Sequence, residues 1–185
     1  MKKPFIIGIA GCTQSGKSTF TRELEKALSD VNLKIFHIDN YHKPKDEQPI
    51  AKAPFTNKTY TDFNSLVSFN TAQLFFDLQN EMKLNKVDLI IVEGTMILHD
   101  ENILNMLDLK LFVETRADER AVRYIESYSQ HHGHDFIKNS YLDLVRYRMD
   151  EYIEPTKWRA DIIINGSIMS AQAVNMVKTY LTTQV

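Results

Sequence analysis

The feature that most constrains this chain is an octapeptide, Gly11-Cys12-Thr13-Gln14-Ser15-Gly16-Lys17-Ser18, that fits the phosphate-binding loop pattern G-x-x-x-x-G-K-[ST]. It follows the apolar run Phe5–Ala10 and precedes a segment with helical character that starts at Thr19. A strand before the loop and a helix after it are required, because backbone N–H groups wrap around a phosphate and the helix N-terminus faces the anion. The sequence therefore predicts a nucleoside triphosphate site in an α/β fold.

The pattern predicts a role for most residues of this loop. The residues expected to bind ATP are Gly11, Thr13, Gln14, Ser15, Gly16, Lys17, Ser18 and Thr19. Lys17 is expected to reach oxygens of the β- and γ-phosphates, and the hydroxyl of Ser18 to ligate Mg²⁺. A chance glycine-rich turn is the alternative, and the flanking strand and helix argue against it.

Length and composition favour one domain over residues 1–185, because 43% of the residues are hydrophobic and no linker-like stretch interrupts the chain. The 22 basic and 24 acidic residues are intermixed and give a net charge of −2, so we expect neither nucleic acid nor a membrane surface as a partner. Cys12 is the single cysteine, which excludes an intrachain disulfide and favours a cytoplasmic location. The sequence leaves the oligomeric state open.

Short β-branched runs alternate with segments of helical spacing, which predicts a parallel sheet with helices on both sides. The expected strands are Phe5–Ala10, Lys34–Ile38, Asp88–Glu93, Leu109–Glu114 and Asp161–Ile164. The continuous apolar character of 89–92 and 162–164 predicts strands that are covered on both faces. Residues 40–62 contain three prolines and form the longest stretch predicted to be irregular, and long loops are often functional.

Two carboxylates follow neighbouring predicted strands: Asp39 after the second and Glu93 at the end of the third. Ligands bind at the carboxyl ends of strands in such sheets. In phosphoryl transfer one carboxylate accepts the proton of the attacking hydroxyl, which suits Asp39, and another holds Mg²⁺, which suits Glu93. The alternatives are a turn or helix cap for Asp39 and a solvated strand end for Glu93.

Several motifs, in this order along most of the chain, resemble the uridine kinase family, to which nicotinamide riboside kinases are closely related. They are the loop at 11–18, Asp-Asn-Tyr-His-Lys-Pro at 39–44, Val92-Glu93-Gly94, Phe112-Val113-Glu114-Thr115 with Ala117-Asp118, Arg120 and Arg123, and Glu154-Pro155-Thr156-Lys157 followed by Ala160-Asp161-Ile162-Ile163-Ile164. The resemblance implies a three-layer α/β/α P-loop kinase with a five-stranded parallel sheet and a small mobile lid at about 127–140. The implied reaction is ATP-dependent, Mg²⁺-assisted phosphorylation of the 5′-hydroxyl of a ribonucleoside.

The resemblance also implies roles for individual residues. Asp39 matches the catalytic base, Lys17 the phosphate contact, and Ser18, Asp39 and Glu93 the metal site. Tyr41 and His42 fall where relatives line the nucleoside site. Phe63 matches an aromatic residue that packs on the base, although it could equally be a core residue. Asn64 stands where relatives have an Asp that binds ribose hydroxyls, and an amide lacks the charge assistance of a carboxylate.

The expected lid departs from the family pattern. Uridine kinases carry Arg-Gly-Arg, whereas this chain has His131-His132-Gly133-His134-Asp135, and Ser127 replaces an arginine expected for ribose. Arg120 and Arg123 remain as candidate catalytic phosphate contacts, or else are surface ion-pair partners. The histidines are expected to form a solvated loop, and a metal site built from them is the alternative.

The acceptor is not decided by the sequence. The segment between Asn70 and Asp88 reads as one helix, without the hairpin that longer uridine kinases insert there, and this leans toward nicotinamide riboside kinases. The Glu154-Pro155-Thr156-Lys157 motif leans toward uridine kinases instead. A kinase of a non-nucleoside alcohol and a catalytically weakened ATP-binding protein are the other hypotheses.

Overall fold

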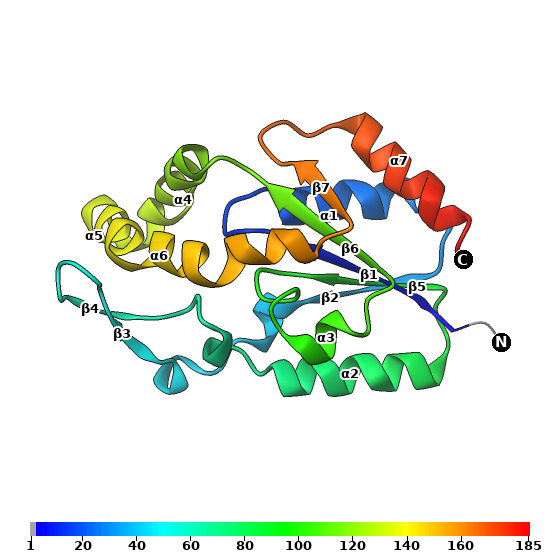
Figure 1. Cartoon of the computed structure of the whole chain (residues 1–185), viewed down its shortest axis with the longest axis horizontal. Coiled ribbons are helices and arrows are strands. Elements are labelled where there is room, and N and C mark those ends of the chain that lie inside the picture. The colour runs from blue at the N-terminus through cyan, green and yellow to red at the C-terminus, as the bar shows by residue number, and fades with distance from the viewer. Residues whose placement is uncertain (1–2) are drawn as a thin grey trace.

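The computed structural model describes residues 3–185 and contains a five-stranded parallel sheet between two layers of helices (Figure 1). The strands are β1 (Phe5–Ala10), β2 (Leu33–His37), β5 (Leu89–Glu93), β6 (Leu109–Glu114) and β7 (Ile162–Asn165), in the order β2-β5-β1-β6-β7. All neighbouring pairs in this sheet are parallel. The predicted three-layer α/β/α architecture with a five-stranded parallel sheet is confirmed. The first two residues of the predicted 1–185 domain lie outside the described residues.

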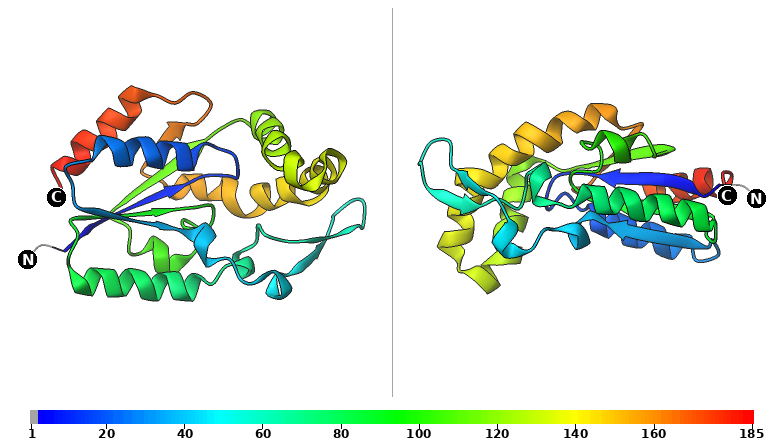
Figure 2. Two further views of the ribbon diagram at one scale, coloured as in Figure 1. Left: turned by 180° about the vertical axis from the view of Figure 1, so that it is seen from behind. Right: turned by 90° about the horizontal axis from the view of Figure 1, so that it is seen from below.

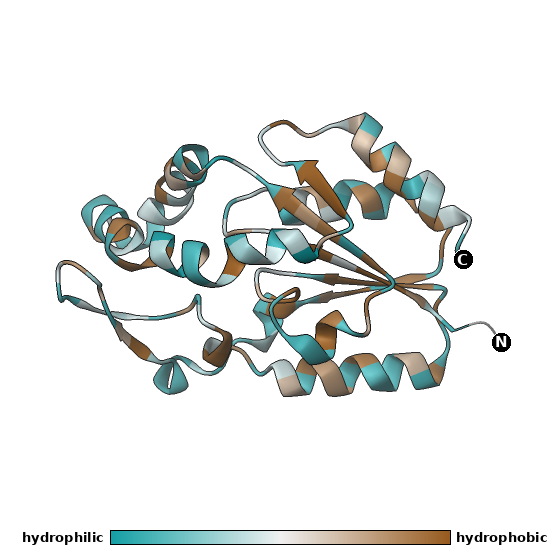
Figure 3. Cartoon of the chain, in the orientation of Figure 1, coloured by the Kyte–Doolittle hydropathy of each residue, from teal (hydrophilic) through white to brown (hydrophobic). Residues whose placement is uncertain are grey.

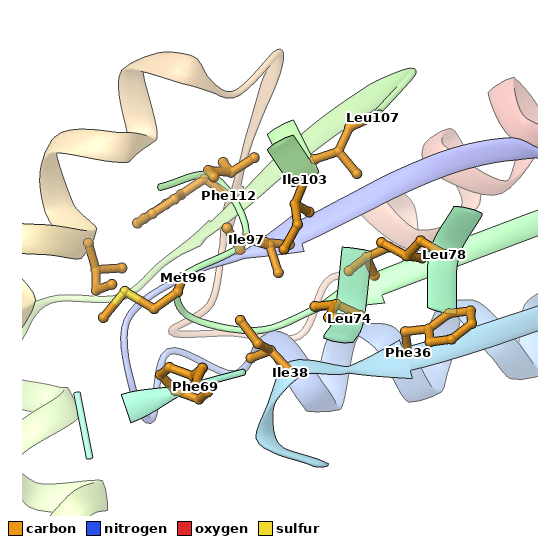
Figure 4. Packing of buried hydrophobic residues seen from close by; sticks show 14 of the residues in the cluster. Phe36, Ile38, Phe69, Leu74, Leu78, Met96, Ile97, Ile103, Leu107 and Phe112 are labelled. Atoms are coloured by element: carbon orange, nitrogen blue, oxygen red, sulfur yellow. The ribbon is translucent and has the colours of Figure 1, made fainter. Parts of the chain in front are cut away.

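Helices cover both faces of the sheet, as the two additional views show (Figure 2). On one face α1 (Lys17–Ala27) and α7 (Ala171–Thr182) bury Phe20, Leu24, Val177 and Leu181 against the strands. On the other face lie α2 (Thr71–Leu84) and α3 (Glu101–Leu104), and Leu74, Leu78, Ile103 and Phe112 meet there (Figure 4). Adjacent strand residues such as Ile6 and Ile7 enter opposite clusters, because strand side chains alternate between faces.

The strands differ in how far they are covered. Every residue of β5 is buried, as its apolar run predicted. The same prediction is wrong for β7, because Ile162 and Ile163 are 41% and 44% exposed. This strand lies at the edge of the sheet, pairs only with β6, and buries Ile164 alone beneath α7. The hydropathy of the strands is visible in Figure 3, where β7 is as hydrophobic as the central strands.

The stretch predicted to be irregular contains a hairpin. Strands β3 (Ile50–Lys52) and β4 (Thr59–Thr61) pair antiparallel, with Ala51 opposite Tyr60. The segment after it is the predicted single helix, α2, which Asn70 caps by accepting a hydrogen bond from the backbone of Gln73. The chain thus lacks a hairpin between residues 70 and 88 but has one earlier, at 50–61.

The segment expected to be a loop around Gly133 is helical. Helix α4 (Ala117–His132) ends there and α5 (His134–Ser140) begins, with Gly133 at φ +79°. The chain continues as helical segments η4 (Tyr141–Val145), α6 (Arg146–Arg148), η5 (Met149–Ile153) and η6 (Glu154–Arg159). Helices α4 and α5 and the β3–β4 hairpin extend from the same end of the molecule, opposite to the chain termini (Figure 1). Among residues 3–185, no helix combines the length and hydropathy needed to cross a membrane.

Candidate active site

The phosphate-binding loop joins β1 to α1 and reaches the N-terminus of α1 as predicted. The backbone N–H of Ser15 donates to the carbonyl of Cys12 at 3.1 Å, which curls the loop. Gln14 has φ +60° and Gly16, the residue before α1, has φ +93°. A side chain at position 16 would be strained in that left-handed conformation. The curled loop leads directly into the positive end of a helix, an arrangement that suits an anion.

Glu93 connects the loop to the carboxyl end of β5. Its Oε1 accepts a hydrogen bond from the Ser18 hydroxyl at 2.9 Å and lies 3.9 Å from Lys17 Nζ. Its Oε2 lies 2.7 Å from Nδ1 of His37. The Glu93 carboxylate is buried, so these partners compensate for its lost hydration. Lys17, Ser18 and Glu93 thus form one cluster, as the sequence predicted they would.

His37 was not among the residues predicted from the sequence. Its position opposite Glu93 follows from strand register, since the two residues are paired across β2 and β5. The sequence alone does not give the strand order, so this pairing could not be predicted from it.

Asp39 follows β2 in the helical turn η1 (Ile38–Tyr41) and is exposed. This turn packs on the end of β5 through Ile38, which lies against Gly94. A Cβ at position 94 would lie 1.9 Å from Ile38 Cγ2, and the φ of +155° is one that side chains rarely adopt. Glycine at the end of β5 therefore allows Asp39 to stand beside the phosphate-binding loop.

A cavity of about 710 Å³, here called the central cavity, joins the loop to the hairpin and to helices α4 and α5. It is lined by Thr13, Lys17, Asp39, His42, Lys45, Tyr60, Thr61, Phe63, Asn64, Phe69, Thr95, Tyr124, Tyr128, His132, Phe136, Ile137, Ser140, Leu144 and Val145. Lys17 of α1 and Asp39 of η1 are among these lining residues. Six Phe or Tyr rings and two imidazoles line the cavity, which makes it suited to a planar ring.

His42 and Phe63 form part of the aromatic wall. The centroid of the His42 ring lies 4.1 Å from that of Phe69 and 6.0 Å from that of Phe63. Burial lowers the pKa of His42, against the opposing effect of the Asp39 carboxylate. The imidazole is therefore neutral at physiological pH and can serve as a hydrogen-bonding group.

The other predicted substrate residues divide between the cavity and the core. Asn64 lines the cavity, whereas the hydroxyl of Tyr41 donates to Asp77 of α2 at 2.9 Å and its ring packs on the hydrophobic core. Asp62 was not among the residues predicted from the sequence. Its buried carboxylate accepts from Nε of Arg148 at 2.7 Å and from the backbone of Asn64 at 2.9 Å, which fixes the turn that carries Asn64.

Neither predicted arginine lines the central cavity. Arg120 is buried, and its Nη1 donates at 2.6 Å to both the Thr115 carbonyl and Oε1 of Glu154. Cys12 donates to the same Oε1 at 3.3 Å, and burial raises the pKa of this thiol. The contacts of Arg120 and Cys12 with Glu154 thus join α4 and the phosphate-binding loop to η6.

The guanidinium group of Arg123 donates hydrogen bonds to backbone carbonyls. Its Nη1 donates to the carbonyls of Gln14 at 3.3 Å and Gly166 at 3.1 Å, and its Nη2 to that of Ser167 at 3.2 Å. Because it donates to all three carbonyls, Arg123 links the phosphate-binding loop to the segment that follows β7.

Of the predicted lid histidines, His132 lines the central cavity. His131 and His134 are exposed, and Asp135 pairs with Lys138 at 2.9 Å. No group of three or more His, Cys, Asp or Glu side chains within residues 3–185 could hold a metal ion, so the alternative of a histidine metal site is wrong. The helix is interrupted at Gly133, so His131 and His132 end α4 whereas His134 and Asp135 begin α5, and residues three or four apart here do not share one helix face.

A parallel α/β/α sandwich with a phosphate-binding loop after its first strand is the fold of P-loop kinases. The sequence pattern of the Phosphoribulokinase / Uridine kinase family matches residues 65–173. A uridine kinase of Clostridium botulinum (strain Kyoto / Type A2) is 32% identical over 96% of this chain and 95% of that protein. A uridine kinase of Lactococcus lactis subsp. lactis (strain IL1403) is 28% identical over 97% of this chain and 96% of that protein.

The fold is shared with solved structures. The structure of a possible uridine kinase from Bacillus stearothermophilus superimposes with a TM-score of 0.56 at 16% identity, over 89% of this chain and 90% of that one. The chain belongs to the Phosphoribulokinase / Uridine kinase family. The predicted resemblance is therefore confirmed.

Proposed function

We propose that this protein is an ATP-dependent kinase that phosphorylates the 5′-hydroxyl of a ribonucleoside. The observation that supports the proposal is that Lys17, Asp39 and six aromatic rings line the same cavity. A phosphate donor held at the loop and a ring-bearing alcohol held among the aromatic side chains would then meet at Asp39.

The donor side fits MgATP. The curled loop and the N-terminus of α1 suit the β-phosphate, and Lys17 suits the β- and γ-phosphate oxygens. Mg²⁺ in such sites takes one or two carboxylates, phosphate oxygens and several waters, so the Ser18 hydroxyl, Glu93 and Asp39 are a sufficient protein contribution. When bound, the ion would neutralise negative charge on the phosphates.

The acceptor side fits a nucleoside better than a sugar phosphate. Phe63, Tyr60 and Phe136 offer ring faces for a base, and Asn64 offers an amide that can both donate to and accept from ribose hydroxyls. The lysines of the cavity are Lys17, at the donor end, and Lys45. An acceptor that already carries a phosphate would compete with ATP for this limited positive charge. Aromatic rings also bind cationic rings, so nicotinamide riboside is the second candidate acceptor.

The proposed reaction needs one proton transfer. The acceptor oxygen bonds to the γ-phosphorus, the bond from that phosphorus to the bridging oxygen breaks, and the electron pair leaves with ADP. Asp39 takes the proton of the acceptor hydroxyl, and Lys17 stabilises charge on the phosphates. The presence of a base beside the loop argues against a protein that only binds ATP.

We further propose that residues 1–185 act as a single kinase domain in the cytoplasm, with a lid at about 127–140. The C-terminal turns of α4 and the start of α5 contribute Tyr128, His132 and Phe136 to the cavity wall. Movement of these turns would open and close the cavity around a substrate.

The test is a panel of acceptors with MgATP, scored by ADP release above background hydrolysis and by the mass of the product. Uridine, cytidine, nicotinamide riboside, a pentose phosphate and pantothenate would separate the hypotheses. We expect one or more ribonucleosides to gain a single phosphate at the 5′-oxygen. Phosphorylation of the pentose phosphate or pantothenate alone would overturn the nucleoside assignment, and ATP binding without any phosphorylated product would support a nucleotide-binding role instead.

A further inference from the structure

Much of the wall of the central cavity comes from two separate parts of the chain. The β3–β4 hairpin and the turn after it supply Tyr60, Thr61, Phe63 and Asn64. Helical segments α5 and η4 supply Phe136, Ile137, Ser140, Leu144 and Val145. The hairpin and α5 extend from the same end of the molecule (Figure 1). The width of the cavity therefore depends on the contacts that join the hairpin to the helical segments.

Two side chains on the hairpin side make such contacts. The hydroxyl of Tyr60 donates to Oδ2 of Asp143 at 2.7 Å, and Nε of Arg148 donates to Oδ2 of Asp62 at 2.7 Å. The backbone N–H of Asp62 donates to the carbonyl of Pro49 at 2.8 Å, which continues the hairpin pairing beyond β4. Tyr60 and Asp62 are two residues apart in this extended stretch, so their side chains point to the same side and reach one helical surface.

On the helical side, a local change of helix geometry brings the two partners together. Asp143 and Arg148 are five residues apart, and in a regular α-helix such side chains would point about 140° away from each other. Asp143 lies in η4, which is π-helical, and Arg148 ends α6 directly after it. A π-helical turn closes hydrogen bonds between residues five apart, which turns such residues toward one face. Asp143 and Arg148 can therefore both meet the hairpin.

The contact between Arg148 and Asp62 also orders the turn after the hairpin. Asp62 is 1% exposed, and its Oδ1 accepts a hydrogen bond from the backbone N–H of Asn64 at 2.9 Å. The backbone carbonyl of Asp62 accepts from the buried hydroxyl of Ser68 at 2.6 Å. Both oxygens of the Asp62 carboxylate are thus used within the protein. The turn presents Phe63 and Asn64 to the cavity instead.

We propose that Arg148 is a positioning residue for the acceptor. Through Asp62 it fixes the turn that carries Phe63 and Asn64, and together with the contact between Tyr60 and Asp143 it sets the width of the cavity where the acceptor binds. Arg148 does not line the cavity, so it acts through these residues and does not touch the acceptor. This inference rests on the proposed function, which places the acceptor against Phe63 and Asn64.

The test compares Arg148→Met with Arg146→Met. Arg146 is an exposed arginine of the same segment, and its guanidinium packs on the ring of Tyr147. The acceptor that the panel identifies is titrated at saturating MgATP, and MgATP binding is measured by calorimetry. We expect Arg148→Met to raise the acceptor KM by about tenfold, because a turn that is ordered a tenth of the time binds about tenfold more weakly, while the Kd for MgATP changes by less than about twofold. Arg146→Met should change neither value.

Hydrogen exchange of the Asn64 backbone amide is the second measurement, and it needs no acceptor. This amide should exchange faster in Arg148→Met than in the parent protein, and at the parent rate in Arg146→Met. Should Arg148→Met not fold, Asp143→Ala takes its place, because it breaks the other contact without leaving a charge buried. Losing one hydrogen bond of this kind should raise the acceptor KM by about two- to tenfold.

Two results would overturn the role of Arg148: an acceptor KM equal to that of the parent, or an equal loss of affinity for MgATP and for the acceptor, which is the result of general destabilisation. Failure of the proposed function would appear separately, as a parent protein that phosphorylates no acceptor in the panel. In that case the exchange rate of the Asn64 amide decides whether Arg148 orders the turn, and an unchanged rate would overturn the inference.

Discussion

The ion pair between Arg120 and Glu154 should contribute measurably to the free energy of unfolding, because it is buried next to the phosphate-binding loop. The Arg120 side chain is 4% exposed and that of Glu154 is 24% exposed, with Nη1 and Oε1 2.6 Å apart. Removing one partner of a buried ion pair costs about 3–5 kcal/mol, because the remaining charge stays desolvated and uncompensated. In Glu154→Gln the amide oxygen can still accept from Arg120, so we expect the lower end, about 3 kcal/mol.

The assay is urea denaturation, with the free energy of unfolding of Glu154→Gln compared with that of the parent protein. Asp118→Asn is the matched control, because it breaks the exposed contact between Arg116 and Asp118 at the start of the same helix. The control should unfold at the urea concentration of the parent. A loss of less than about 1 kcal/mol in Glu154→Gln, the range of surface pairs, would refute the argument that Arg120 is a buried anchor of the loop.

Three further predictions concern the cavity. Lys17→Ala should lower kcat by about 100-fold or more while the far-UV circular dichroism spectrum stays unchanged, and a loss of only a few-fold would contradict the role of the loop. Asn64→Asp should tighten ribonucleoside binding by about 1 kcal/mol in calorimetry, since a carboxylate is the stronger acceptor, and an equal gain with the 2′-deoxy analogue would exclude a contact with that hydroxyl. Burial lowers the pKa of His42, so below the ordinary histidine value the unfolded chain binds more protons and the free energy of unfolding falls as pH falls. His42→Gln should flatten this slope in urea denaturation between pH 7.5 and 5, and identical slopes would show that His42 does not contribute.

Short sequence patterns predicted the elements that depend on neighbouring residues along the chain, such as individual strands and the phosphate-binding loop. The bounds of β1 and β6 agree with those expected from the sequence at both ends. β1 is an uninterrupted apolar run, and β6 is apolar except at Lys110 and Glu114. The loop after β1 and the proximity of Ser18 and Glu93 also followed, since parallel strands bring their carboxyl ends to one edge.

Features that depend on the neighbours of a segment were not predictable in this way. The exposure of β7 follows from its place at the edge of the sheet, which its apolar residues do not encode. Strands β3 and β4 have three residues each, too few for an alternating pattern to be recognised. Arg120 and its partner Glu154 are 34 residues apart in the sequence, and Arg123 and its partner Gly166 are 43 apart, so no local pattern predicts either contact.

The central claim is that Asp39 takes the proton of an acceptor hydroxyl bound in the central cavity. The most direct measurement is kcat and MgATP affinity of Asp39→Asn, with the acceptor that the panel identifies. An amide keeps the shape of the carboxylate but cannot accept the proton, so kcat should fall by about 100- to 10,000-fold, far more than the affinity for MgATP falls. A variant that retains the kcat of the parent, or that loses MgATP affinity as strongly as kcat, would contradict the assignment of Asp39 as the base.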